Sequence, residues 1–221
     1  MASTEEDVLT SLELILQSRK DYYQLLCLLF LEPDQKNMFK LRDHGNFELL
    51  REIYAGGDLL ENFFETLTMD RLDKEKEEYR RLFIGPGPLA APPWESYYRS
   101  KERLLFEKWT LQVRSLYHQF GLQSRKENNE PDDHLLIELE FMISLVHLSL
   151  HEKEIGRLLD NLKSQQEFLE NHFLLWIPSF CTKVEEETDS RLYLGAARLL
   201  EDFIRFDLTT IVEVREVLMN V

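Results

Sequence analysis

The sequence predicts an all-α protein: a single-domain bundle of about ten helices with a proline-rich loop crossing one face. Apolar residues recur at helical spacing in nearly every segment outside one stretch that is rich in proline and glycine. No convincing alternation of apolar and polar side chains marks a strand. Glycine–serine linkers and low-complexity tracts do not interrupt the 221 residues, so we expect one domain over 1–221.

The expected helices are placed by their apolar stripes and by the residues that can begin or end them. The first helix begins near Glu5, with 1–17 as an extra N-terminal helical segment, and continues through 18–31. A helix over 131–151 is apolar on almost all sides and therefore belongs at the centre of the bundle. Further helices are expected at 47–54, 59–67, 74–83, from Ser96 or Ser100 to Gly121, at 154–163, at 165–181 with a break near Pro178, at 191–206, and in a final segment to about Leu218.

The chain is strongly acidic. It contains 26 Lys and Arg residues against 41 Asp and Glu residues, a formal net charge of −15. This charge opposes sequence-independent binding to nucleic acid or to an anionic bilayer, because both need a cationic surface. It favours basic partners, although solubility alone also explains it. The most apolar stretches are too short for a membrane span or are interrupted by Glu138, Glu140 and His147, so direct membrane insertion is not expected.

Two features of the sequence predict a reducing, cytoplasmic location. Cys27 and Cys181 are the two cysteines, far apart and each among apolar neighbours, which suits buried free thiols better than a disulfide or a metal framework. The N-terminal residues 1–7 are acidic rather than basic, unlike the start of a secretory signal.

The most informative stretch is the loop that follows the expected helix 74–83. Gly85, Pro86, Pro92 and Pro93 shape it, because proline lacks a backbone donor and restricts the residue before it. The loop ends in Trp94, which either anchors it to the core or offers an aromatic surface to a partner. With Glu95 beside it, the indole can accept both the methylenes and the charge of an arginine, and Tyr97 and Tyr98 extend this surface.

A second candidate segment is Pro131-Asp132-Asp133-His134. Proline suits the first position of a helix, and acids in the first turn complement the positive end of the helix dipole, so capping alone explains the pattern. The functional alternative is that the two acids and the histidine border a peptide groove beside the proline-rich loop.

Three segments, in this order along the chain, resemble the TorD/DmsD family: the loop that ends in Trp94-Glu95-Ser96, the segment Asn129-Glu130-Pro131-Asp132-Asp133-His134, and Phe168-Leu169-Glu170-Asn171-His172-Phe173 followed by Trp176. The resemblance extends from about Ser18 to about Phe206 and covers most of the chain. Tyr97 departs from it, since the family more often has a small aliphatic residue there.

This family consists of cytoplasmic chaperones that mature molybdoenzymes and bind their twin-arginine leader peptides. The resemblance therefore implies a non-catalytic chaperone whose partners are a leader peptide and the apo form of a molybdenum-containing oxidoreductase. It implies a peptide site formed by Trp94, Glu95, Tyr97, Tyr98, Asp132, Asp133 and His134, with Gly85, Pro86, Pro92, Pro93 and Pro131 shaping the loops. Oligomers remain open, and domain swapping between helical subunits is one route to them.

Three alternatives remain. The first is a NarJ-like chaperone that assembles a reductase subunit without exporting it. The second is a nucleotide- or metal-dependent enzyme, which would need a nucleotide-binding or metal-binding site. The third is a structural helical adaptor, which would need no such site. His147 and His151 lie four residues apart, as two metal ligands can, but the sequence offers no third ligand, no CxxC and no GxxxxGK loop. We therefore expect no metal, no cofactor and no enzymatic activity.

Overall fold

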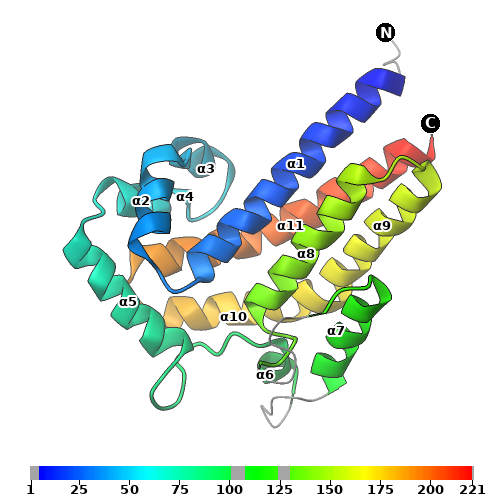
Figure 1. Ribbon diagram of the computed structural model, residues 1–221. Coiled ribbons are helices and arrows are strands. Elements are labelled where there is room, and N and C mark those ends of the chain that lie inside the picture. The colour runs from blue at the N-terminus through cyan, green and yellow to red at the C-terminus, as the bar shows by residue number, and fades with distance from the viewer. Residues whose placement is uncertain (1–4, 101–107, 124–129, 221) are drawn as a thin grey trace.

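The regular elements of the computed structural model are helices (Figure 1). The structure describes residues 5–100, 108–123 and 130–220. Within these ranges the all-α prediction is confirmed, and extended backbone pairing is limited to one isolated bridge. The helices are α1 (Glu5–Phe30), α2 (Gln35–His44), α3 (Phe47–Ile53), α4 (Gly57–Glu65), α5 (Met69–Phe83), α6 (Glu95–Arg99), α7 (Lys108–Gln119), α8 (Leu135–His151), α9 (Ile155–Phe168), α10 (Leu174–Glu187) and α11 (Arg191–Met219), with a π-helical turn (Leu169–Phe173) between α9 and α10.

The long helices α1, α8, α9 and α11 lie side by side and form the body of the molecule, with α2 to α4 grouped at one end and α6 and α7 at the other (Figure 1). As predicted, α8 is central: Leu139, Met142, Leu145 and Val146 are fully buried. A buried polar network also joins α1, α9 and α11. Among the described helices, none is both long and apolar enough to cross a bilayer.

The helices differ from expectation in several respects, including an earlier start of α5 at Met69. Helix α2 is not foreseen; the side chain of Asp34 begins it by accepting from the backbone N–H of Asn37. Pro178 lies inside α10 without ending it, because the burial of neighbours such as Trp176 and Phe180 outweighs one missing backbone donor. The two expected C-terminal helices form one helix, α11.

Parts of the expected pattern fall outside the described residues. The predicted helix from Ser96 or Ser100 to Gly121 is represented by α6 and α7, and 101–107 between them are not described. The same holds for 1–4, 124–129 and 221.

The proline-rich loop connects α5 to α6. Gly85 and Gly87 have φ angles of 98° and 108°, a region that other residues rarely adopt. Pro92 and Pro93 are buried. The carbonyl of Pro93 accepts from the backbone N–H of Leu135 (2.9 Å), at the start of α8. The loop thus delivers Trp94 to the beginning of the central helix.

Candidate functional site

The two sequence segments that were singled out meet in space. Trp94 and His134 form an antiparallel bridge. The backbone N–H of Glu95 donates to the carbonyl of Asp133 (3.0 Å) on one side of it. The proline-rich loop therefore lies beside the segment that precedes α8, as the peptide-groove hypothesis requires.

Asp132 and Asp133 do not form the exposed acidic rim that the sequence suggests. They are 1% and 0% exposed, respectively. Asp133 accepts from the backbone N–H of Ser96 and from Oγ1 of Thr110, both at 2.7 Å. Asp132 forms an ion pair with Arg114, and its carbonyl accepts from the hydroxyl of Tyr117 (3.0 Å).

These contacts give the two acids a positioning role, because Thr110, Arg114 and Tyr117 all belong to α7. The expected capping of α8 by the acids is also wrong. Helix α8 begins later, at Leu135, and its N-cap is His134, whose Nδ1 accepts from the backbone N–H of Leu136 (3.1 Å). The buried acids hold α7 against the start of α8.

Trp94 is partly exposed but is not isolated. Its Nε1 donates to Oε1 of Glu130 (3.0 Å), and its ring meets the imidazole of His134 edge to face, with centroids 5.5 Å apart. Glu95, expected beside the indole at the surface, is fully buried instead. The acid that accompanies the indole is therefore Glu130.

The two tyrosines of the proposed surface differ from each other. Tyr98 stacks on the buried indole of Trp176, with centroids 5.8 Å apart, so part of its ring belongs to the interior. Tyr97 packs edge to face against Tyr98 at 5.0 Å and is partly exposed. Of the pair, Tyr97 is the better placed for contact with a partner.

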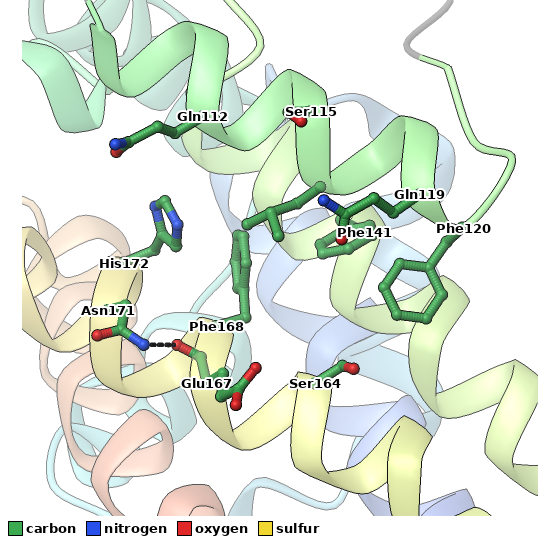
Figure 2. A pocket seen from close by; sticks show the side chains of 11 residues that line it. Gln112, Ser115, Gln119, Phe120, Phe141, Ser164, Glu167, Phe168, Asn171 and His172 are labelled. Atoms are coloured by element: carbon green, nitrogen blue, oxygen red, sulfur yellow. Dashed lines mark hydrogen bonds between the residues drawn. The ribbon is translucent and has the colours of Figure 1, made fainter. Parts of the chain in front are cut away.

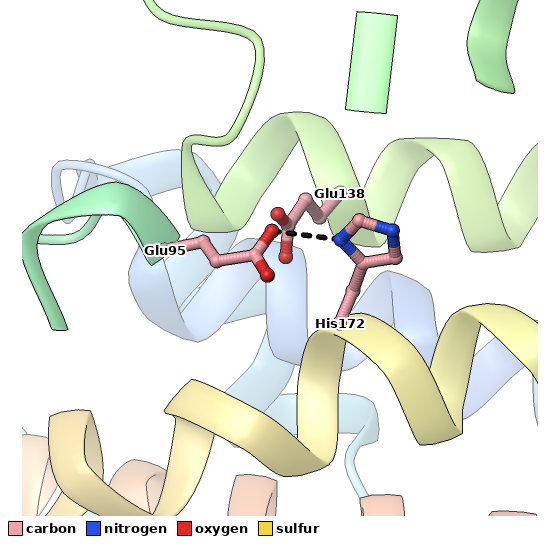
Figure 3. A group of neighbouring side chains, drawn as sticks. All are labelled: Glu95, Glu138 and His172. Carbon is pink, nitrogen blue, oxygen red and sulfur yellow. Dashed lines mark hydrogen bonds and ion pairs between the residues drawn. The ribbon is translucent and has the colours of Figure 1, made fainter. Parts of the chain in front are cut away.

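Glu95 belongs to a buried polar cluster with Glu138 and His172 (Figure 3). Nδ1 of His172 lies 2.8 Å from Oε2 of Glu95, and Arg99 forms an ion pair with the same carboxylate. Nε1 of Trp176 donates to Oε2 of Glu138 (3.0 Å). Burial, followed by the charges of Glu95 and Asp133, raises the pKa of Glu138 well above its ordinary value.

Donor atoms of Glu95, Glu138 and His172 lie within 4.8 Å of one another, and such a set can in principle ligate Zn²⁺ or Mn²⁺. Glu95 contacts His172 and Arg99, and Oε2 of Glu138 accepts from Trp176, whereas Oε1 of Glu138 is buried without a hydrogen-bond partner among the described residues. The absence of a metal stays a prediction. Sequence reasoning missed this cluster because its members come from α6, α8 and the π-helical turn; Glu138, one of two acids in the largely apolar α8, was the available signal.

A groove lies next to this cluster, between α7, α8, α9 and the π-helical turn (Figure 2). Its volume is about 380 Å³. Aromatic and aliphatic side chains form much of its lining: Leu116, Phe120, Phe141 and Phe168. Polar side chains surround them, among them Gln112, Gln119, Glu167 and Asn171. The groove thus combines an apolar lining with a hydrogen-bonding margin, as a peptide site does.

The groove, the buried cluster and the two predicted segments are connected. His172 lines the groove and also contacts Glu95, which lies next to Trp94. Asp132 and Asp133 hold α7, which forms one wall of the groove. None of the seven predicted peptide-binding residues, all of which the structure describes, lines the groove itself; Glu95, Asp132 and Asp133 are connected to it through His172 and α7.

Comparisons with known proteins agree with this fold. The fold is similar to the crystal structure of a putative redox enzyme maturation protein from Archaeoglobus fulgidus. The match covers 85% of this chain and 92% of that one, with a TM-score of 0.53 and 23% sequence identity. A match at this identity concerns the fold alone. Residues 51–182 match the family model for the nitrate reductase delta subunit, so the chain belongs to that family.

Individual relatives are chaperones named TorD, and the resemblance to the TorD/DmsD family is thereby confirmed. One from Vibrio parahaemolyticus serotype O3:K6 is 28% identical over 62% of this chain and 66% of its own length. One from Vibrio cholerae serotype O1 (strain ATCC 39541) is 33% identical over 62% of this chain and 64% of its own. These two alignments cover slightly less than two thirds of the relatives. A third, from Aliivibrio salmonicida, is 25% identical over 86% of this chain and 93% of its own length.

Proposed function

We propose that this protein is a cytoplasmic chaperone that binds the twin-arginine leader of a molybdenum-containing redox enzyme while that enzyme is assembled, before its export. The observation that carries the proposal is the apolar groove between α7, α8 and α9, which opens beside the segments that resemble the TorD/DmsD family. The chaperone names of the relatives support the same class. The proposed activity is binding, and no covalent step is assigned to it.

The chemistry of such a leader matches this surface. A leader combines an arginine pair with a short apolar segment, and its apolar side chains can pack against the partly exposed Leu116 and Phe120 in the groove. The acidic chain, with a net charge of −15, attracts the arginines. Trp94 and Glu130 offer an indole face beside a carboxylate, and we assign them, with His134 and Tyr97, to direct contact with the leader.

We assign a different role to Glu95, Asp132 and Asp133 because they are buried. They fix the positions of α6 and α7, and a change in any of them affects binding by displacing a wall of the groove. Tyr98 belongs with this supporting group, since its ring stacks on Trp176.

One alternative has a specific observation in its favour. The family model is that of a nitrate reductase delta subunit, which fits a NarJ-like chaperone that assembles a reductase without exporting it. An exporter-linked chaperone requires the arginine pair of its ligand, whereas an assembly chaperone of this second kind does not. A leader with Lys-Lys in place of Arg-Arg separates the two, because lysine cannot reproduce the bidentate fork of arginine.

The direct test is titration of a synthetic Arg-Arg leader into the protein and into two variants of α7. Leu116 lines the groove, whereas Leu111 lies on the same helix and is 59% exposed. We expect Leu116→Glu to weaken leader binding about tenfold or more, because a charge in the groove must be desolvated. The matched variant Leu111→Glu should bind as the unmodified protein does. Equal affinity of both variants, at equal folded fraction, would rule out this groove.

A further inference from the structure

The side chain of Arg99 occupies a site that has all the features of an arginine receptor. Its guanidinium carbon lies 3.6 Å from the ring centroid of Trp109. Its NH1 group donates to the backbone carbonyl of Asn171 (2.8 Å) and forms an ion pair with Glu95. The Arg99 side chain is only 15% exposed, and that of Glu95 is fully buried.

These three partners satisfy different properties of a guanidinium group. The indole accepts its flat face by stacking and cation–π attraction, the carboxylate takes its charge, and the carbonyl takes a further N–H. The ammonium of Lys108 lies 4.1 Å from the centroid of the same indole ring, so the ring of Trp109 attracts a second cation as well. A guanidinium can contact the indole, the carboxylate and the carbonyl at the same time.

This guanidinium site adjoins the groove. Asn171, whose carbonyl binds Arg99, also lines the groove, and so does its neighbour His172, which contacts Glu95 (Figure 2). Gln112, on the α7 turn that follows Trp109, lines it too. A peptide with apolar residues in the groove would therefore have neighbouring side chains close to Glu95 and Trp109.

We propose that the site formed by Glu95, Trp109 and the Asn171 carbonyl is an arginine subsite of the groove, and that the chain's own Arg99 fills it when no peptide is bound. A peptide arginine that enters the subsite displaces Arg99. One guanidinium then replaces another, so the buried carboxylate of Glu95 is never left without a cation. The identity of the peptide rests on the proposed function, but the guanidinium site itself does not.

The intramolecular occupant lowers the apparent affinity for an arginine-containing ligand, because only the fraction of molecules with an open subsite is competent to bind it. It also imposes selectivity. A lysine has no flat guanidinium face to place over the indole of Trp109, so it competes less effectively with Arg99 for the subsite. Arg99 thus acts as an intramolecular competitor, which a ligand must displace from the subsite in order to bind.

The test uses Arg99→Ala and two probes, N-acetyl-arginine methylamide and the Arg-Arg leader. We expect the small probe to bind Arg99→Ala and to raise its melting temperature, while the unmodified protein shows neither effect. The leader should bind Arg99→Ala about tenfold or more tightly. Adding Trp109→Leu to the variant should abolish probe binding. Arg157→Ala, which removes an exposed arginine of α9, is the matched control and should change nothing.

A milder variant guards against loss of folding. Arg99→Lys keeps a cation next to Glu95 but competes less well, so it should also bind the leader more tightly than the unmodified protein does. If the leader binds the unmodified protein, Arg99→Ala and Arg99→Lys with equal affinity and the small probe binds none of them, the subsite is wrong and the proposed function stands. If the probe binds Arg99→Ala but the leader binds no form of the protein, the subsite stands and the proposed function is wrong.

Discussion

Arg19 and Asp207 form a bidentate ion pair in the interior of the bundle. Nε of Arg19 lies 2.6 Å from Oδ1 of Asp207, and its NH2 group lies 3.0 Å from Oδ2. The remaining groups are satisfied as well: Tyr23 donates to Asp207 (2.6 Å), and Gln165 accepts from Arg19 (2.8 Å). This network ties α1 to α11 and α9 at the centre of the molecule.

Removing one member of this pair should cost much of the stability of the fold. We expect Asp207→Asn to lower the free energy of unfolding by about 3 to 5 kcal/mol, because it leaves the Arg19 cation buried without a counter-charge. The double variant Arg19→Met/Asp207→Leu should lose less than this, since it buries no charge. Urea unfolding of the three proteins measures both values. A loss below about 1 kcal/mol in Asp207→Asn would mean that water reaches the pair.

The burial of Asp133 gives a second prediction. Asp133→Asn should lower the free energy of unfolding by about 2 to 3 kcal/mol, because an amide cannot accept from both the Ser96 N–H and the Thr110 hydroxyl as the carboxylate does. Asp160→Asn, at an exposed position of α9, is the control and should change stability by less than about 0.5 kcal/mol.

The same variant tests how Asp133 affects leader binding. Because the carboxylate supports α7 and does not face a ligand, the salt dependence of leader affinity should keep its slope in Asp133→Asn even where the affinity itself falls. A flatter slope would return Asp133 to the role of a direct arginine contact.

Glu138 predicts a pH dependence of stability. Its pKa is raised above the ordinary value of 4.5 by burial and by the charges of Glu95 and Asp133. The folded protein therefore binds this proton at pH values where the unfolded chain has released it. The free energy of unfolding should fall as pH rises above about 4.5, by at most about 1.4 kcal/mol per pH unit, until the folded pKa is reached.

Glu138→Gln isolates this effect, because glutamine mimics the neutral carboxyl and still accepts from Trp176. Urea unfolding at several pH values between 5 and 8 should give a steeper decline for the unmodified protein than for the variant. Parallel curves would show that Glu138 is ionised in the folded state throughout this range.

The two thiols should be unreactive in the folded protein. Burial, with a contribution from the charge of Glu140, raises the pKa of Cys27 to about 12, and burial also raises the pKa of Cys181. Thiolate is the reactive form, so iodoacetamide at pH 8 should label both cysteines slowly in buffer and rapidly in denaturant. Peptide mapping after alkylation follows each site separately. Cys27 is partly exposed whereas Cys181 is buried, so prompt labelling of Cys27 in buffer would show that its thiol ionises more readily than a pKa of about 12 allows.

Much of the fold could be predicted because apolar periodicity determines which helix faces are buried. The apolar segment 131–151 indeed gives the central helix α8, and the proline-rich loop lies between helices as its composition requires. Helix α2 was not predicted because Met38 is the one buried side chain of this helix, so its sequence shows little apolar periodicity. The local signal for this helix is its N-cap, Asp34. The continuity of α10 through Pro178 depends on tertiary packing, which local propensity does not contain.

The candidate site was less predictable. The segments of Trp94 and His134 were singled out correctly as neighbours, but the burial of Asp132 and Asp133 depends on where α7 docks. Apolar periodicity does not predict which polar side chains come into contact when they lie far apart in sequence, as Glu95 and His172 do. The groove itself is a space between helices, so no single segment encodes it.

The π-helical turn at 169–173 is a π-bulge, in which the chain has one residue more than an α-helix of the same length would have. Because the bulge absorbs this residue, the apolar faces of α9 and α10 stay aligned with their neighbours on either side. A chain that is one residue shorter here would make a regular helix and keep those faces, but it would turn the imidazole of His172 away from Glu95. The extra residue therefore sets the position of His172 relative to Glu95 and to the proposed groove.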